Sequence, residues 1–242
     1  GAMPRGGEPL FRREDLRDEA QVAVFQRLLD ETWKAKPTRD RRGAMPSRLL
    51  VRKVQRVEAP TLWNRFARRR RQMARRPGGC AAVEDGGAPV RTQGICEAAP
   101  ELLGPCERAC NEHYLFHGTG PAGALGIIQA GFDMSRVGTS TGLMLGPGAY
   151  FAEASSKCDE YAKADDFSGM CAVLVCRVLC GRMLRTLGKP DPQALAEPGF
   201  VAKHDGILGD REASVGTYRE FVVFTPEQVY PEYLVLYDRV FY

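Results

Sequence analysis

The sequence lacks a hydrophobic run that approaches the length of a membrane span, so we expect no contact with the core of a lipid bilayer. Its first residues are charged and lack the apolar segment of a secretory signal, which predicts an intracellular protein, either nuclear or cytoplasmic. The pattern GxxxxGK followed by Ser or Thr is also missing, so a P-loop nucleotide site is not indicated. A net charge of only +4 does not by itself indicate a nucleic-acid partner.

What the sequence does have is the composition of an ordinary globular protein, with 44% hydrophobic and 26% charged residues. Its 242 residues suit one large domain, or one domain with an extension, and are ample for a hydrophobic core. We expect Gly1-Ala2-Met3 to be the remnant of protease cleavage of an expression tag.

Eight cysteines raise the question of a zinc site or of disulfides. Cys106 and Cys110 form a CxxxC pair, but a structural zinc ion needs four ligands that converge on it, and one such pair is weak evidence. Disulfides are rare in the reducing interior of a cell. We therefore expect no metal and free thiols, of which three act as small strand hydrophobes: Cys171, Cys176 and Cys180.

Apolar residues recur at helical spacing from Asp15 to Trp33, which predicts one amphipathic helix after a disordered Gly/Arg-rich start, residues 1–12. A basic linker follows at residues 34–46. We assign residues 1–46 to an N-terminal extension and residues 47–242 to the main domain.

The main domain is predicted to open with a strand at Ser47–Val57 and a helix at Thr61–Arg76, because Pro60 suits the first turn of a helix. The helix is rich in arginine, which could give it a phosphate-binding face for nucleic acid. We favour the simpler alternative of a solvated helix face, because no aromatic platform for bases accompanies the arginines. They are Arg65, Arg68, Arg69, Arg70, Arg71, Arg75 and Arg76.

The rest of the chain predicts an α+β fold. Residues 77–105 are rich in Gly, Ala and Pro and predict a long surface loop or insertion. Beyond them, strands outnumber helices without regular alternation, which argues for split sheets and against a doubly wound fold. Strands are predicted at Tyr114–Gly118, Gly148–Phe151, Met170–Gly181, Glu220–Phe224 and Tyr233–Arg239, helices at Pro121–Gly131 and Ser155–Ala164, and a loop-rich stretch at Leu187–Gly216.

Three separated motifs carry side chains that suit a single reaction. His117 stands in YLFHGTG, Tyr150 in GPGAYFAE and Glu220 in TYREFVVF, each on or beside a strand-like run. An imidazole, an aromatic ring and a carboxylate in one site could hold a positively charged aromatic leaving group. They could also stabilise the cationic sugar that it leaves behind.

In this order the motifs resemble the catalytic domain of the poly(ADP-ribose) polymerases, the diphtheria-toxin-like ADP-ribosyltransferases. The resemblance runs from about Ser47 to Tyr242 and includes the later stretch EQVYPEYL. Within the family, the sequence is most similar to the tankyrases and other members without a helical regulatory domain. It implies the ADP-ribosyltransferase fold, with split mixed or antiparallel β-sheets and flanking helices, here preceded by an N-terminal helix extension.

The resemblance also implies roles for the residues of the motifs. His117, Tyr150 and Glu220 would be the catalytic residues, and His117 would hydrogen-bond the adenosine ribose of NAD⁺. Gly118 would offer its backbone N–H and C=O to the nicotinamide carboxamide, which a residue without a side chain permits. Thr119 would lie beside the adenosine ribose.

By the same resemblance, Tyr150 and Tyr161 would stack on the two faces of the nicotinamide ring. A cationic ring between two aromatic faces gains an attraction of about 1–2 kcal/mol. Glu220 would bind the 2′-hydroxyl of the nicotinamide ribose, stabilise the oxocarbenium ion and help to deprotonate the acceptor.

Two positions depart from the family pattern. Cys158 stands where the family usually has a serine that donates to the carboxamide, and a thiol is a weaker hydrogen-bond partner. Gly123 replaces a polar residue on the adenine side. Arg136, in the donor loop Phe132–Leu145, could reach the pyrophosphate, and Phe200–Gly216 would form the loop on the acceptor side.

We therefore expect a monomeric enzyme that uses NAD⁺ as co-substrate, needs no metal and transfers ADP-ribose to protein side chains, its own included. Glu220 favours poly-transfer, because in this family the glutamate permits elongation, although it does not guarantee it. Two alternatives stay open. One is a mono-transferase that acts on protein or on nucleic-acid ends, and the other is a non-catalytic module that binds NAD⁺ or ADP-ribose.

Overall fold

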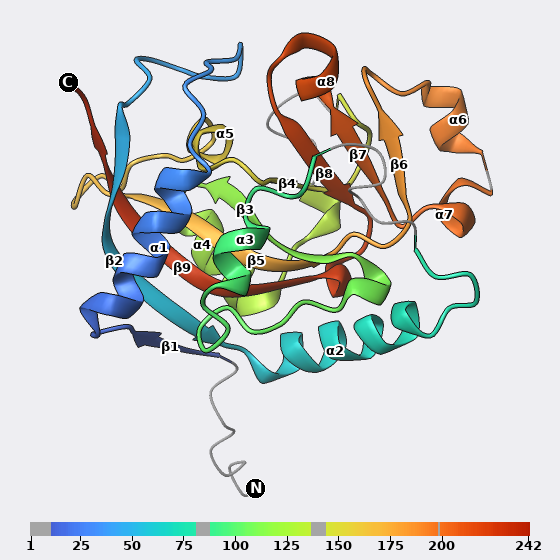
Figure 1. Ribbon diagram of the computed structural model, residues 1–242, viewed down its shortest axis with the longest axis horizontal. Helices are drawn as coiled ribbons and strands as arrows, with labels where there is room; N and C mark the ends of the chain where they lie inside the picture. The colour runs from blue at the N-terminus through green and yellow to red at the C-terminus, as the bar shows by residue number, and fades with distance from the viewer. Residues whose placement is uncertain (1–10, 81–87, 137–143, 198) are drawn as a thin grey trace, which may run out of the picture.

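A computed structural model describes residues 11–80, 88–136, 144–197 and 199–242. Their strands form one sheet in the order β1-β2-β9-β5-β3-β4-β8-β7-β6 (Figure 1). All neighbours pair antiparallel except β6 and β7. The strands are β1 Arg12–Asp15, β2 Arg48–Glu58, β3 Glu112–Thr119, β4 Ala149–Ala152, β5 Cys171–Leu179, β6 Met183–Thr186, β7 Gly206–Asp210, β8 Arg219–Val223 and β9 Val229–Val240.

The sheet is split, and its two halves meet at β3 and β4. These two strands pair at the residues Phe116 and Ala152, whereas β3 pairs with β5 along its whole length. Beyond Phe116, β3 makes no further ladder pair with β4, and the His117 side chain bonds to the backbone of β4 instead. The predicted α+β class with a split mixed sheet is confirmed.

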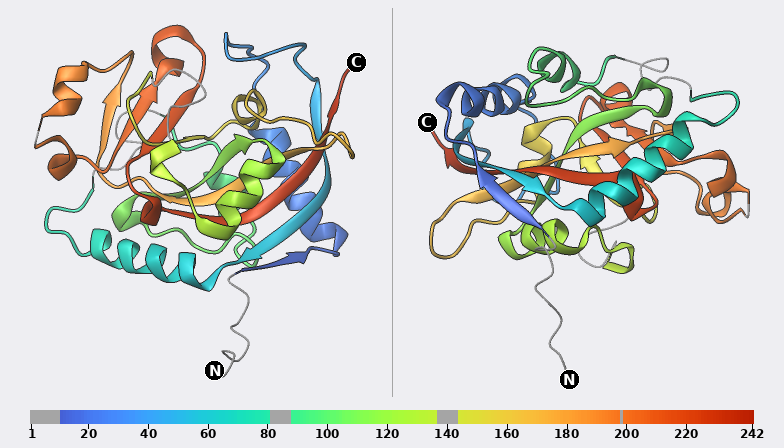
Figure 2. Two further views of the ribbon diagram at one scale, coloured as in Figure 1. Left: turned by 180° about the vertical axis from the view of Figure 1, so that it is seen from behind. Right: turned by 90° about the horizontal axis from the view of Figure 1, so that it is seen from below.

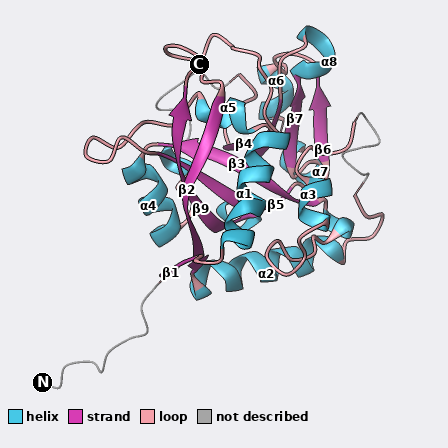
Figure 3. Cartoon of the chain, turned by 60° about the vertical axis from the view of Figure 1, so that its left-hand side comes forward, coloured by secondary structure: helices cyan, strands magenta, loops and turns pink. Residues whose placement is uncertain are grey.

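Helices cover both faces of the larger half. Figure 2 shows α1 and α3 on one face and α4 on the other. Figure 3 shows α6, α7 and α8 gathered around the smaller half with β6 and β7. The helices are α1 Glu19–Glu31, α2 Pro60–Ala74, α3 Gln93–Glu97, α4 Pro121–Ala130, α5 Ser155–Asp159, α6 Pro192–Ala196, α7 Phe200–Lys203 and α8 Arg211–Val215, with 3₁₀ turns η2 Arg108–Cys110, η3 Met134–Arg136 and η4 Pro226–Gln228.

The central strands are buried on both faces because alternate side chains enter two different cores. Val173 and Val175 of β5 pack in the core under α1 and α3. Leu174 and Cys176 pack in the core under α2 and α4. All nine residues of β5 are buried, which explains why the sequence there is a continuous apolar run.

The predicted first helix is present as α1, but it begins later than expected. Asp18 caps it by accepting a hydrogen bond from the backbone of Ala20 at 2.9 Å. The residues before the cap form β1, an edge strand that the sequence did not predict. Phe25 and Leu28 of α1 are fully buried in the core that they share with the sheet.

The arginines of α2 and of the two residues after it are partly engaged within the protein. Arg76 Nη1 lies 2.7 Å from the carboxylate of Asp205, and Arg70 reaches Glu112 at 3.4 Å. Phe66 and Met73 bury the opposite side of the helix. The sequence favoured a solvated helix face and did not predict these ion pairs, and nothing in the contacts requires a nucleic acid.

Two stretches expected to be loops contain packed elements. In the described part of residues 77–105, α3 buries Ile95, and Leu103 is 1% exposed. The stretch Leu187–Gly216 contains α6, α7, α8 and the fully buried strand β7. Among the residues that the structure describes, no helix is long and apolar enough to cross a membrane.

Candidate active site

Three neighbouring strands bring the predicted catalytic residues together where the sheet splits. Glu220 on β8 pairs directly with Ala152 on β4. Ala152 in turn pairs with Phe116 on β3, the residue before His117. Tyr150 lies two positions before Ala152, so its side chain points to the same face of β4 as that of Ala152.

The imidazole of His117 is fixed by the backbone of the next strand. Its Nδ1 lies 2.9 Å from the carbonyl oxygen of Tyr150. A carbonyl can only accept, so Nδ1 carries the proton and the neutral ring offers Nε2 as an acceptor. Burial lowers the pKa of His117, which keeps the ring neutral at neutral pH. The rings of Phe132 and Phe151 pack against it at 4.9 and 5.6 Å between centroids.

The phenol of Tyr150 is held at its far end. Its hydroxyl donates to the carbonyl oxygen of Gly146 at 2.7 Å and accepts from the backbone N–H of Leu145 at 3.1 Å. Burial raises the pKa of Tyr150 to about 12, so the phenol stays protonated. The ring is therefore a fixed, uncharged wall.

Gly118 is the point at which β3 passes closest to α5. A Cβ atom at this position would lie 1.9 Å from the carbonyl oxygen of Cys158, so glycine is required there. Cys158 is 4% exposed, and burial raises the pKa of its thiol, although the nearby backbone N–H groups of Ala152 and Gly118 act against this rise. The thiol is therefore neutral and faces the backbone of Gly118.

The two other predicted contacts lie at the ends of this region. A Cβ atom on Gly123 of α4 would lie 2.4 Å from Thr119 Oγ1, so this glycine makes room for the Thr119 hydroxyl at the end of β3. Arg136 ends η3. Its side chain, like residues 137–143 of the predicted donor loop, lies outside the described part of the structure.

A buried lysine stands beside Glu220. Lys157 Nζ lies 3.8 Å from Glu220 Oε1, 3.0 Å from Glu160 Oε2 and 2.7 Å from Asp40 Oδ2. The same Asp40 oxygen accepts from the Tyr161 hydroxyl at 2.7 Å. Burial alone would lower the pKa of Lys157, but the surrounding carboxylates outweigh it and raise that pKa.

Glu220 has a perturbed carboxyl group. Its side chain is 17% exposed, and burial raises its pKa above the ordinary value, an effect that Lys157 opposes. The residue before it, Arg219, forms a buried pair with Glu153, with Nε to Oε1 and Nη2 to Oε2 both at 2.6 Å. This bidentate pair ties β8 to the residue that follows β4.

Sequence reasoning missed Asp40, Lys157, Glu160 and Arg219. Lys157 and Arg219 directly precede two residues that were singled out, Cys158 and Glu220, and this adjacency was an available signal. Asp40 gave none, because it lies in the basic segment expected to be a linker. His204 and Asp205, in the predicted acceptor-side loop, lie elsewhere: the Asp205 carboxylate pairs with Arg76 and Arg182.

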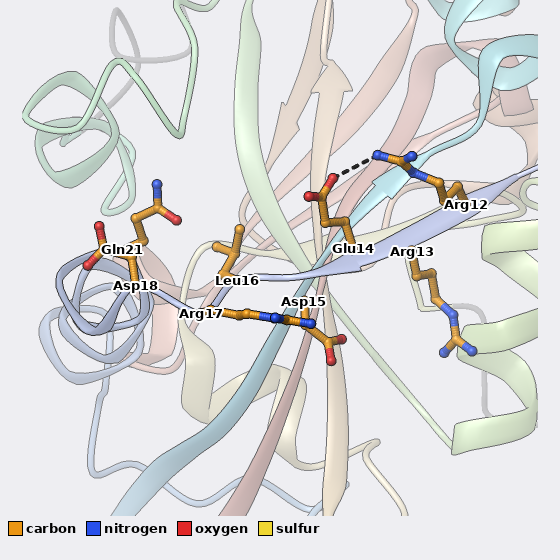
Figure 4. A pocket seen from close by; sticks show the side chains of 8 residues that line it. All are labelled: Arg12, Arg13, Glu14, Asp15, Leu16, Arg17, Asp18 and Gln21. Atoms are coloured by element: carbon orange, nitrogen blue, oxygen red, sulfur yellow. Dashed lines mark hydrogen bonds and ion pairs between the residues drawn. The ribbon is translucent and has the colours of Figure 1, made fainter.

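One hollow of the described structure lies away from these residues. It measures about 740 Å³ and lies beside β1 and the start of α1. Figure 4 shows it lined by charged side chains, with Arg12 bonded to Glu14. Within the described ranges, no group of three or more His, Cys, Asp or Glu residues is placed to hold a metal ion.

Several known proteins are similar to this chain. Protein mono-ADP-ribosyltransferase PARP12 of Mus musculus is 27% identical over 188 residues, which cover 78% of this chain and 22% of that protein. Protein mono-ADP-ribosyltransferase PARP4 of Mus musculus is 31% identical over 134 residues, 52% of this chain and 7% of that protein. Protein mono-ADP-ribosyltransferase PARP11 of Homo sapiens is 23% identical over 211 residues, which cover 80% of this chain and 53% of that protein.

The chain thus spans about a fifth of the length of PARP12, the fraction being 22%. A family model described as the poly(ADP-ribose) polymerase catalytic domain matches residues 34–239, most of the chain. This match includes the three strands that carry His117, Tyr150 and Glu220. The chain therefore belongs to the poly(ADP-ribose) polymerase catalytic-domain family.

Proposed function

We propose that this chain is an NAD⁺-dependent ADP-ribosyltransferase that modifies protein side chains and releases nicotinamide. The observation that carries the proposal is the meeting of His117, Tyr150 and Glu220 on three adjacent strands of a family-matched domain. The bond between nicotinamide and ribose is already weakened by the positive charge of the ring. Catalysis therefore needs orientation of the dinucleotide and a negative charge near the developing cation.

Orientation is the task of residues on β3 and β4, in α5 and in the turn after it. Neutral His117 offers Nε2 as an acceptor for a ribose hydroxyl. Gly118 offers backbone groups to the carboxamide, and the Cys158 thiol lies beside them. Tyr150 and Tyr161 are the aromatic walls for the cationic ring, and both are held through their hydroxyls.

Glu220 is the electrostatic and acid–base residue. When the C1′–N bond breaks, its electron pair leaves with nicotinamide, and the cationic C1′ faces the carboxylate. The oxygen of the protein side chain that receives ADP-ribose then bonds to C1′, and the proton that this oxygen loses passes to Glu220. The ion pair with Lys157 favours the ionised form that both steps require.

The length of the product is a separate matter. Glu220 supplies the carboxylate that elongation needs, and this favours poly-transfer, as the sequence predicts. The three relatives are named mono-ADP-ribosyltransferases, and these names favour a single transfer as the second candidate. Arg65 and Arg68 of α2 and Arg75 at its C-cap are exposed, but no described contact favours nucleic-acid ends as acceptors.

Labelled NAD⁺ incubated with the wild-type chain and with Glu220→Gln tests the proposal, with products separated on a denaturing gel. We expect labelled protein from the wild type and a loss of about a hundredfold or more in rate from the variant, with NAD⁺ affinity nearly unchanged. A high-molecular-weight smear indicates poly-transfer, and a sharp band indicates a single transfer. If the wild-type chain binds NAD⁺ but no protein becomes labelled, the proposed enzymatic activity is overturned in favour of a binding module.

A further inference from the structure

We propose that Asp40 is a positioning residue of this active site, which orients the Tyr161 ring and holds Lys157 at a distance from Glu220. The proposal rests on the function proposed above. Asp40 belongs to residues 34–41, the part of the N-terminal segment that lies across α5; we call this part the strap. A strap residue therefore completes a site whose other members come from the sheet and α5.

The strap is anchored to the catalytic region on both sides of Asp40. Thr38 donates to Glu160 from its backbone N–H at 3.0 Å and from its hydroxyl at 2.7 Å. Arg41 donates to Asp159 and to the carbonyl of Ser156, both at 2.9 Å. The Arg41 side chain is 4% exposed. Buried charged hydrogen bonds of this kind fix a backbone more firmly than exposed ones do.

The Asp40 carboxylate points from this anchored strap to two residues of the site. One of its oxygens, Oδ2, lies 2.7 Å from both the Tyr161 hydroxyl and Lys157 Nζ. Tyr161 lies in the turn after α5 and is only half-buried, so packing alone does not fix its ring. The short bond to Asp40, beside a longer one from Lys157 Nζ at 3.3 Å, supplies the constraint at the far end of the ring, as the bonds to Gly146 and Leu145 do for Tyr150.

The second effect of Asp40 is on the charge at Glu220. Lys157 is 2.7 Å from Asp40 but 3.8 Å from Glu220, beyond hydrogen-bond range. Asp40, together with Glu160 at 3.0 Å, thus retains the ammonium and leaves the Glu220 carboxylate free for the substrate hydroxyl. Its own negative charge also acts to raise the pKa of Glu220.

Several other charged or titratable groups face Glu220 and act on the same carboxylate. They are Lys157 and Cys158 from α5, Glu160 and Tyr161 after it, Arg211 from α8 and Tyr150 from β4. Burial acts to raise the pKa of Asp40, but its hydrogen bonds with Lys157 and Tyr161 outweigh burial and lower that pKa. Asp40 therefore stays ionised in the pH range where Glu220 titrates. Removing the Asp40 charge therefore changes one contribution at Glu220 throughout that pH range.

Two substitutions separate the two effects. Asp40→Asn keeps an oxygen that can accept from the Tyr161 hydroxyl but removes the charge. Asp40→Ala removes both. Asp15→Asn is the matched control, because Asp15 also accepts from a lysine and a second side chain, Lys53 at 2.8 Å and Gln55 at 2.6 Å, on the edge strand β1.

We expect Asp40→Ala to raise KM for NAD⁺ about threefold to tenfold, the range for one lost hydrogen bond, with a smaller change in kcat. Asp40→Asn keeps KM within about twofold of the wild type. Both variants move the acid limb of kcat/KM to lower pH by about half a pH unit. A general loss of structure would not raise KM in Asp40→Ala alone while shifting the acid limb in both variants. Asp15→Asn should leave both KM and the acid limb unchanged.

A double-mutant cycle with Tyr161→Phe tests whether Asp40 affects NAD⁺ binding through the Tyr161 hydroxyl. If Asp40 acts on NAD⁺ through the Tyr161 hydroxyl, Asp40→Ala adds no further rise in KM when that hydroxyl is absent. Equal effects of Asp40→Ala in both backgrounds, or variants indistinguishable from Asp15→Asn, would overturn the proposal. So would equal losses of activity in both Asp40 variants without a shift in pH profile.

Direct NAD⁺ binding keeps this test apart from that of the proposed function. A wild-type chain that binds NAD⁺ without turnover overturns the enzymatic function alone, and Kd then takes the place of KM in the Tyr161 cycle. A wild-type chain that neither binds nor turns over NAD⁺ overturns both proposals. A threefold or greater rise in Kd for Asp40→Ala, absent in the Tyr161→Phe background, supports the positioning role in either case.

Discussion

A Cβ atom at position 118 would lie 1.9 Å from the carbonyl oxygen of Cys158, so β3 and α5 can approach this closely only through a glycine. The contact is between backbone atoms, which cannot move aside as the end of a flexible side chain can. It sets the distance between the strand that carries His117 and the helix that carries Lys157 and Cys158.

Gly118→Ala should therefore disturb the site and the fold together. We expect a loss of about 1–3 kcal/mol in the free energy of unfolding, since the added methyl forces backbone shifts, and weaker NAD⁺ binding. Gly126→Ala is the control, because Gly126 lies in α4 with nothing within 4 Å of the place that an added methyl would take, and it should stabilise the protein by about 0.5–1 kcal/mol. Urea unfolding checks both, and a Gly118→Ala protein as stable as the wild type would contradict the packing argument.

The pH dependence should report Glu220. The carboxylate must be ionised, and burial raises its pKa above the ordinary value, so activity is lost as the pH falls through that raised pKa. Lys157 lowers the pKa of Glu220, and Lys157→Gln should therefore move the acid limb of kcat/KM upward by about one pH unit. His117 should add no limb near neutral pH, because burial lowers its pKa. A limb that Lys157→Gln leaves in place would assign the titration to another group.

Arg219 offers a prediction about the support of Glu220. Its pair with Glu153 is buried, and replacing Arg219 leaves Glu153, among the described residues, with only the backbone N–H of Arg91 at 2.7 Å and the Arg91 guanidinium at 3.9 Å. Arg219→Met should cost about 3–5 kcal/mol of unfolding free energy, whereas the double variant with Glu153→Leu should recover part of it. Thermal unfolding of the single and double variants measures this coupling, and strictly additive losses would show that the pair does not act as a unit.

The catalytic motifs could be found from the sequence because each lies on a strand with a local signature. His117, Tyr150 and Glu220 each lie on or beside a short apolar run that is typical of a strand, and the order of the motifs supplied the family resemblance. Pro60 and Pro121, both at the first position of a helix, likewise marked the starts of α2 and α4.

What could not be predicted depends on contacts between distant positions. Asp40 meets Tyr161 across 121 residues of sequence, and no local pattern marks either end of that hydrogen bond. The strand β7 reads GILGD, too short and too rich in glycine to be recognised, and it exists because β8 pairs with it. The helix expected over Ser155–Ala164 ends at Asp159, whose carboxylate accepts from Tyr237 and Arg239 of β9.

Cys158 allows the carboxamide contact to be tested by a single atom. A serine hydroxyl is a stronger and shorter hydrogen-bond donor than a thiol, so Cys158→Ser should tighten the binding of nicotinamide-like inhibitors about threefold to tenfold. The buried hydroxyl should be tolerated, because the backbone N–H groups of Gly118 and Ala152 already face this side chain.

Cys180→Ser separates that gain from the general effect of a buried hydroxyl. Cys180 is fully buried in the apolar core after β5, so the serine should cost about 1–3 kcal/mol of stability and leave inhibitor affinity unchanged. Calorimetric titration with nicotinamide itself measures the affinities, and unfolding curves measure the stabilities. If Cys158→Ser binds nicotinamide no better than the wild type while Cys180→Ser behaves as expected, the side chain at position 158 does not face the carboxamide. In that case the backbone of Gly118 holds it alone.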